Sequence, residues 1–152
     1  MSKFIITGGS KLEGKVKVAG SKNSALALVS GALLADSPVT LTNVPDIRDI
    51  AVMTELIEEL GGRVEKSEGS LTIDASGLSS YELEPSLSER LRASVILAAP
   101  LLVRFGKAIV TPPGGDQIGE RLLDTHFSMM KEFGVNVEAK DGKFHLDWEK
   151  KK

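Results

Sequence analysis

The sequence contains no cysteine, carries little net charge and has no long apolar run. The missing cysteine excludes disulfides, thiolate metal sites and a cysteine nucleophile. No apolar stretch approaches the roughly 20 residues that a membrane-spanning helix needs, and residues 1–7 hold one short apolar run that is unlike a signal peptide. The formal net charge is −2, so no bulk attraction to nucleic acid is expected. These shortages favour a cytoplasmic protein that binds neither membranes nor nucleic acid.

What is present is typical of a globular protein. The chain has 152 residues, of which 41% are hydrophobic and 26% are charged. A chain of this length buries roughly 70% of its unfolded surface, which is enough for a real core. Residues 149–152 end in three lysines and are expected to form a solvated tail.

Two parts of the chain repeat one pattern. The sequence ELGGRVE at 59–65 resembles EFGVNVE at 132–138, and a turn and an alternating segment follow each copy. The turns are 67–69 and 140–142, and the alternating segments are 70–74 and 143–147. A glycine turn between alternating apolar segments predicts a β-hairpin in each copy.

The spacing between the copies changes along the chain. The hairpin segments are 73 residues apart, whereas residues 38–41 align with 106–109 at an offset of 68. The difference predicts five added residues between the second strand and second helix of the second copy, within residues 111–121. Loops carry function more often than the scaffold does. A neutral surface insertion is the alternative, but the glycines, prolines, Asp116 and Arg121 favour a functional loop.

Each unit therefore reads strand–helix–strand–helix–strand–strand, which predicts an α/β fold of tandem βαβαββ repeats. The opening strands are expected at 15–18 and 81–84, the first helices around 25–33 and 91–102, and the second helices near 50–60 and 120–133. The strand–helix–strand order predicts parallel pairing through right-handed crossovers, closed by one antiparallel hairpin. The units span 14–78 and 79–148.

Two segments near the N-terminus suggest phosphate binding. Residues 9–15 have the spacing of a P-loop, but Val16 stands where the motif needs a hydroxyl, so a nucleotide triphosphatase is disfavoured. The segment Gly20-Ser21-Lys22 precedes the first helix, where free N–H groups, the helix dipole and a lysine suit an anion. An ordinary helix cap with a solvated lysine explains these residues equally well.

Other candidate residues lie in the second unit. Arg92 interrupts an apolar helix face, and a solvated arginine is the alternative explanation. Asp116 follows two glycines and could donate a proton if a closed site raised its pKa. Arg121 could clamp a carboxylate or phosphate, and Asp124 and His126 follow it. No spacing of histidine and acidic residues predicts a metal site.

Taken together, these residues resemble the enolpyruvyl transferases, in the branch that acts on UDP-N-acetylglucosamine. The resemblance covers essentially the whole chain and is carried by three segments: 20–26 (GSKNSAL), 91–94 (LRAS) and 113–126 (PGGDQIGERLLDTH). The third segment is specific to this branch and differs in the sister enzyme that uses shikimate 3-phosphate. The resemblance implies that the units form part of an inside-out α/β barrel domain, and that residues 1–13 hold a strand of the other domain, at Phe4 to Thr7.

The implied activity is transfer of the enolpyruvyl group of phosphoenolpyruvate to the 3-hydroxyl of UDP-N-acetylglucosamine, by addition and elimination. The reaction is the first committed step of peptidoglycan synthesis, and so serves cell-wall growth, cell shape and division. The resemblance implies no cofactor and no metal. Its matched positions make Asp116 the proton donor and Lys22 and Arg121 catalytic. Phosphoenolpyruvate would be bound by Lys22 and Asn23, and UDP-N-acetylglucosamine by Arg92, Arg121, Leu122, Leu123, Asp124, Thr125 and His126.

The sequence departs from the family pattern in three ways. Asp116 stands where the family usually has cysteine, and a carboxylic acid can replace the thiol as a proton donor. Leu122 replaces a usual proline. Family members are also more than twice as long, with two domains of three units each. The chain is therefore expected to be an N-terminal portion of such an enzyme, and an open apolar edge predicts self-association or a C-terminal partner chain. A non-catalytic UDP-sugar-binding or interaction fragment and one half of a split transferase are the alternatives.

Overall fold

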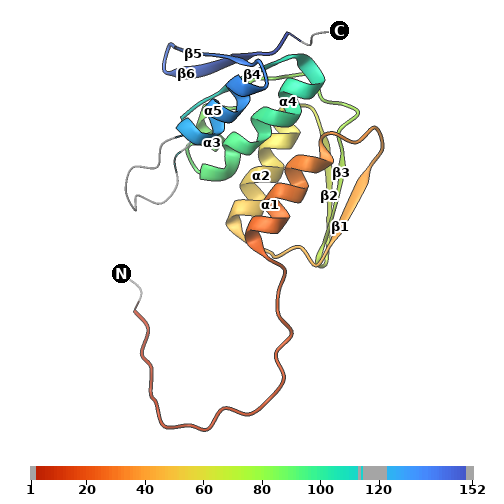
Figure 1. The fold of residues 1–152 in the computed structure, drawn as a ribbon. Coiled ribbons are helices and arrows are strands. Elements are labelled where there is room, and N and C mark those ends of the chain that lie inside the picture. The colour runs from red at the N-terminus through yellow and green to blue at the C-terminus, as the bar shows by residue number, and fades with distance from the viewer. Residues whose placement is uncertain (1–2, 113, 115–122, 150–152) are drawn as a thin grey trace.

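The computed structural model describes residues 3–112, 114 and 123–149. Its elements follow the chain from the red N-terminal arm to the blue C-terminal hairpin (Figure 1). In order they are α1 (Lys22–Ala32), β1 (Val39–Thr42), α2 (Arg48–Glu59), β2 (Arg63–Ser67), β3 (Ser70–Asp74), α3 (Pro85–Ser88), the 3₁₀ helix η1 (Arg92–Leu97), α4 (Ala98–Phe105), β4 (Lys107–Val110), α5 (Asp124–Glu132), β5 (Asn136–Lys140) and β6 (Lys143–Asp147).

The predicted repeat and both predicted hairpins are confirmed. Each unit carries a helical segment, a strand, a helix and a hairpin, and β2–β3 and β5–β6 are offset by 73 residues as expected. In the second hairpin Asp141 and Gly142 have φ values of 50° and 74°. A two-residue turn of type I′ needs positive φ at both positions, which the Asp-Gly pair tolerates.

The predicted parallel pairing of the opening strand with the next strand is confirmed in the second unit, as a single bridge, and is not seen among the described residues of the first. Each sheet has three strands in the order β1-β3-β2 or β4-β6-β5, and every ladder is antiparallel. The hairpin's second strand lies between the other two, so β1 and β2 run parallel without touching. The described parallel pairing is one bridge from Glu82 to Ile109, in the segment where an opening strand was expected. A hairpin signal identifies two neighbours but does not indicate which edge the preceding strand joins.

The two sheets also correct the alignment of the repeats. Ile73 and Leu146 are equivalent residues of the two hairpins. Ile73 pairs with Val39 and Leu146 pairs with Ala108, so Val39 and Ala108 are equivalent residues of β1 and β4. The strand offset is therefore 108 − 39, or 69, against 73 for the hairpins. The increase from 69 to 73 places four added residues, not five, after β4. The fifth added residue lies before β4. A shift of one residue exchanges the two faces of a strand, and buried Ala108 makes the alignment unambiguous.

The expected strands at 4–7 and 15–18 are absent. Residues 3–19 form an exposed arm that leaves the helices (Figure 1), and Phe4 and Val16 are 96% and 91% exposed. A strand needs a neighbour to pair its N–H and C=O groups, and no described segment pairs with this arm.

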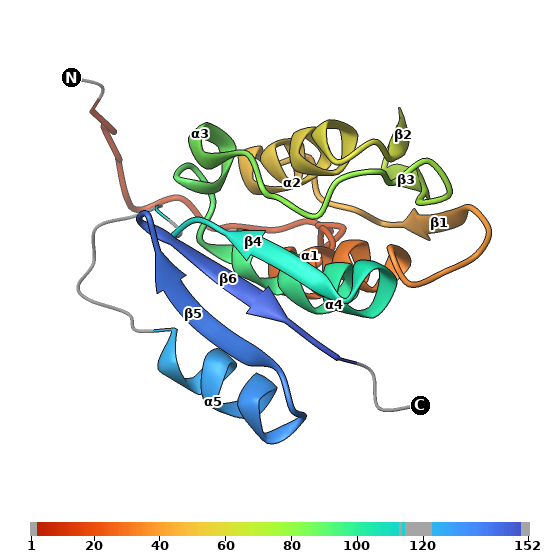
Figure 2. The ribbon, with the colours of Figure 1, turned by 90° about the horizontal axis from the view of Figure 1, so that it is seen from above.

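One contiguous core joins the two units. Helices α1 and α2 lie side by side against the first sheet, and α4 lies beside them and against β4 (Figure 2). Helix α5 lies apart from that group, beside β5, where the rings of Phe127 and Phe144 are 4.6 Å apart. Within the described residues, no helix is long and apolar enough to cross a membrane.

The first helical segment of the second unit is broken, although one helix was expected around 91–102. It consists of η1 and α4, with Pro100 in the first turn of α4. Proline has no N–H to donate to the carbonyl four residues earlier, which is that of Ile96. The Ser30 hydroxyl of α1 donates to this carbonyl instead, at 3.0 Å. A side chain of the first unit thus satisfies a backbone group of the second.

Arg104 makes a second link between the units. Its guanidinium donates to the carbonyls of Leu33 and Ala35, beyond the end of α1, and the Nη2 to Ala35 distance is 2.6 Å. Carbonyls at a helix C-terminus have no partner in the helix. Arg104 therefore caps α1 from α4.

Candidate functional site

The first candidate site lies where α1 begins. Ser21 has extended dihedral angles (φ −72°, ψ 126°) and its Oγ accepts a hydrogen bond from the Ser24 N–H at 3.4 Å. This N-cap starts the helix, so Lys22 is its first residue and Asn23 its second. The Lys22 Nζ lies 3.0 Å from Oδ2 of Asp49, in the first turn of α2. The geometry places an accessible ammonium at a helix N-terminus, where an anion is favoured.

The sequence analysis missed Asp49. Its side chain is 34% exposed and that of Lys22 is 55% exposed, so the pair holds the ammonium in place without burying it. The signal was present, because Lys22 and Asp49 both occur near the start of a helix flanking β1. Helices α1 and α2 begin at the same end of the molecule (Figure 1).

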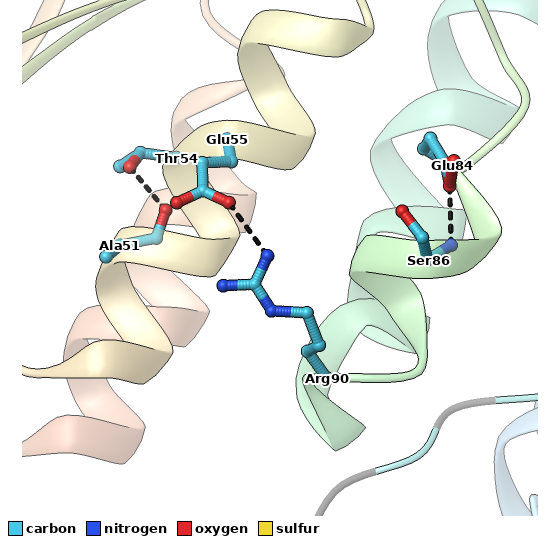
Figure 3. A network of polar contacts seen from close by, with 6 residues as sticks. All are labelled: Ala51, Thr54, Glu55, Glu84, Ser86 and Arg90. Atoms are coloured by element: carbon cyan, nitrogen blue, oxygen red, sulfur yellow. Dashed lines mark hydrogen bonds and ion pairs between the residues drawn. The ribbon is translucent and has the colours of Figure 1, made fainter.

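Arg92 is the first residue of η1 and is half-buried. Nearby Arg90 belongs to the scaffold, since its Nη1 lies 3.2 Å from Oε2 of Glu55 on α2 (Figure 3). In the same view the Glu84 carboxylate accepts the Ser86 N–H at 2.6 Å and so caps α3. These contacts fix the segment that leads into Arg92.

The last group of candidate residues starts α5. Leu123 is buried and its carbonyl accepts the Phe127 N–H at 3.1 Å, whereas Asp124, Thr125 and His126 are exposed. An acidic residue in the first turn suits the helix dipole. Asp124 also lines a hollow of about 340 Å³ between α5 and the β5–β6 hairpin.

Asp116, Arg121 and Leu122 lie outside the described residues. The base of their loop is described, and there the Gly114 N–H donates to the Ser88 carbonyl at 3.3 Å. Ser88, Ser94 and Thr111 are buried, and their hydroxyls have no partner within the described part of the chain. The described residues also contain no group of three or more histidine, cysteine or acidic side chains placed to hold a metal ion.

Known proteins resemble the chain along nearly its full length. The family model of EPSP synthase (3-phosphoshikimate 1-carboxyvinyltransferase) matches residues 6–151. UDP-N-acetylglucosamine 1-carboxyvinyltransferase 3 of Caldanaerobacter subterraneus subsp. tengcongensis is 43% identical over 99% of the chain and 36% of that relative. The Bradyrhizobium diazoefficiens UDP-N-acetylglucosamine 1-carboxyvinyltransferase is 45% identical over 91% of the chain and 32% of its own length. The chain therefore spans about a third of these relatives, in their N-terminal portion.

Solved structures agree on the fold. The enolpyruvyl transferase NikO from Streptomyces tendae superposes with a TM-score of 0.78 at 30% identity, covering 93% of the chain and 31% of NikO. EPSP synthase from Acinetobacter baumannii superposes with a TM-score of 0.63 at 16% identity, covering 89% of the chain and 32% of that protein, and so supports the fold alone. The predicted α/β fold, as part of an inside-out barrel domain, is confirmed. The chain belongs to the EPSP synthase family of enolpyruvyl transferases.

Proposed function

We propose that this chain supplies part of the active site of an enzyme that transfers enolpyruvyl from phosphoenolpyruvate to the 3-hydroxyl of UDP-N-acetylglucosamine. The observation that carries the proposal is the identity of 41–45% to curated carboxyvinyltransferases named for this sugar nucleotide. The place of Lys22 supports it, because an ammonium at the start of α1 suits a phosphorylated carboxylate.

The reaction proceeds by addition and then elimination. The 3-hydroxyl of the sugar gives up its proton to a base outside this chain as its oxygen forms a bond to C2 of phosphoenolpyruvate. The C2=C3 double bond opens, and C3 gains a proton, which we assign to Asp116 as donor. The tetrahedral intermediate then loses a proton from C3 and its C2–O bond to phosphate, which releases inorganic phosphate and restores the double bond. Lys22 and Arg121 would neutralise phosphoenolpyruvate, while Asn23 would orient it.

The UDP-sugar would lie along Arg92, Arg121, Leu122, Leu123 and the first residues of α5, at 124–126. Binding two multiply charged anions together requires several cations, because their charges otherwise repel. The product belongs to peptidoglycan synthesis, so we also infer a cytoplasmic enzyme of cell-wall growth.

Phosphate release tests the proposal. The purified chain is incubated with phosphoenolpyruvate and UDP-N-acetylglucosamine, alone and with the part of the Caldanaerobacter relative that the chain does not cover, supplied as a second polypeptide. We expect release in the second mixture, which would identify the chain as a portion that needs completion. Absence of release in both mixtures, with both polypeptides folded and bound to each other, would overturn the enzymatic proposal and leave a UDP-sugar-binding fragment, which calorimetry with the sugar nucleotide would detect.

Lys22 provides the matched variant for this assay. Lys22→Ala is expected to lower kcat/KM by about 100-fold or more, because it removes a charge that neutralises phosphoenolpyruvate. Lys11→Ala changes an 83%-exposed lysine of the N-terminal arm and should leave the rate within about twofold. Equal rates for the two variants would show that Lys22 does not contribute to the active site.

A further inference from the structure

A glycine in the first unit makes an unusually close backbone contact. A Cβ built on Gly20 would lie 1.8 Å from the carbonyl oxygen of Asn43 and 3.3 Å from Cδ of Pro45. Asn43 itself has a positive φ of 56°, and the next N–H, that of Val44, donates to the Gly69 carbonyl at 3.0 Å. The loop after β1 is therefore fixed to the hairpin on one side and closed over Gly20 on the other.

A glycine in the second unit makes the same kind of contact. A Cβ on Gly114 would lie 1.8 Å from the carbonyl oxygen of Glu89 and 2.6 Å from its carbonyl carbon. The Gly114 N–H donates to the neighbouring Ser88 carbonyl at 3.3 Å. A backbone atom in the way cannot move aside as a flexible side chain can, so any larger residue here displaces one of the two segments.

The two contacts occur at equivalent places in the two units. The buried faces of the first helices match at an offset of 68, as Val29 with Leu97 and Leu33 with Leu101 show. At this offset Gly20 of the first unit is equivalent to Ser88 of the second. At the strand offset of 69, Pro45 is equivalent to Gly114. In each unit the chain just before the first helix thus touches the loop after the first strand. The glycine that permits the contact lies on opposite partners in the two units.

We propose that Gly20 and Gly114 are positioning residues for the reaction. Gly20 lies two residues before Lys22, and Gly114 lies two residues before Asp116. Each glycine holds the backbone against a fixed neighbour immediately before a side chain that the proposed reaction uses. The inference rests on the proposed function, but the contacts themselves can be tested without activity.

The first test uses the unchanged chain and measures amide hydrogen exchange by NMR. The Gly114 amide is expected to exchange at least roughly tenfold more slowly than those of Gly8 and Gly9 in the exposed arm, because it is hydrogen-bonded to Ser88. Exchange as fast as in the arm would overturn the contact at Gly114. This result does not depend on whether the chain takes part in catalysis.

The second test uses variants in the completed enzyme. Gly114→Ala is expected to lower kcat by about 100-fold, since a misplacement near 1 Å can cost that much, with little change in the KM for UDP-N-acetylglucosamine. Gly20→Ala should instead raise the KM for phosphoenolpyruvate through Lys22. Gly31→Ala is the control, because nothing lies within 4 Å of a Cβ there and α1 gains a better helix former.

Three results decide the proposal. Loss of activity in both glycine variants with unchanged kinetics in the control supports it. Wild-type kinetics in the folded variants would overturn it. If the unchanged enzyme releases no phosphate while the Gly114 amide is protected, the proposed function fails and the glycines are structural. Should a variant fail to fold, fast exchange of the Gly114 amide in the unchanged chain would still overturn the proposal at that glycine.

Discussion

At the residue scale, Asp116 is one of the positions where the sequence departs from the pattern that the resemblance implies. The resemblance places a cysteine here, and the chain has none. An epoxide antibiotic that alkylates the family's cysteine should therefore leave this protein unmodified. Intact-mass measurement after incubation with the epoxide tests this, and an adduct mapped to Asp116 would contradict it.

Ser30 is the residue that compensates for Pro100. Ser30→Ala is expected to lower the free energy of unfolding by about 1–2 kcal/mol, because the partly buried Ile96 carbonyl loses this donor. Denaturant titration measures the change. Ser128→Ala removes an exposed hydroxyl on α5 and should change the free energy by less than about 0.5 kcal/mol. Equal effects would mean that water replaces Ser30.

Asp74 gives the chain a predictable response to acid. The Ser76 N–H donates to the carboxylate at 2.9 Å, and this bond, helped by the Ser76 hydroxyl and by Arg63, lowers the pKa of Asp74 below 3.8. A lowered folded pKa contributes stability above the unfolded value, which is lost as pH falls through the folded pKa. NMR titration should place the Asp74 midpoint below 3.8. Asp74→Asn should reduce the loss of stability below about pH 4, and an unchanged acid profile would contradict the assignment.

At the scale of elements, two arginines link the units with unequal strength. Arg104 is half-buried and caps the end of α1, whereas Arg90 and Glu55 are 42% and 44% exposed. Arg104→Met should lower the free energy of unfolding by about 2 kcal/mol, because charged hydrogen bonds to two partly buried carbonyls are lost. Arg90→Met should cost at most about 1 kcal/mol, as exposed ion pairs do. Thermal or denaturant unfolding compares the two, and the reverse order would contradict this reading.

The elements also explain where sequence reasoning succeeded and failed. The hairpins were predictable because Asp141-Gly142 and alternating segments are local signals. The strand order and the one-residue alignment were not, because they depend on β1 pairing with β3, as Val39 does with Ile73, and these strands are far apart in the sequence. The helical segment expected at 91–102 is present, but it is divided into η1 and α4, which an apolar pattern alone does not predict.

At the scale of the whole molecule, several large apolar side chains remain exposed on helices. Leu28, Val103 and Met129 are 57%, 42% and 55% exposed, and Phe133 at the end of α5 is 71% exposed. Apolar surface of this kind favours association, so we expect the purified chain to self-associate. Sedimentation velocity should show a mass that rises with concentration.

A matched pair of variants makes that expectation specific. Leu28→Lys should weaken association, whereas Leu12→Lys makes an equal change in the arm, where the side chain is 93% exposed. If both variants associate as the unchanged chain does, the helix surface is not the interface. A chain that stays monomeric at all concentrations would contradict the expectation itself.

The sequence by itself determined the repeat, the hairpins and the family, because each depends on short patterns of residue type and spacing. The candidate residues Lys22, Asn23 and Arg92 were identified in the same way, and their roles remain proposals. Only the tertiary structure showed that β3 and β6 are the central strands and that Asp49 forms an ion pair with Lys22. It also showed that Gly20 and Gly114 permit equivalent backbone contacts in the two units. These features are contacts between segments far apart in sequence, and their energies depend on distances that no local pattern encodes.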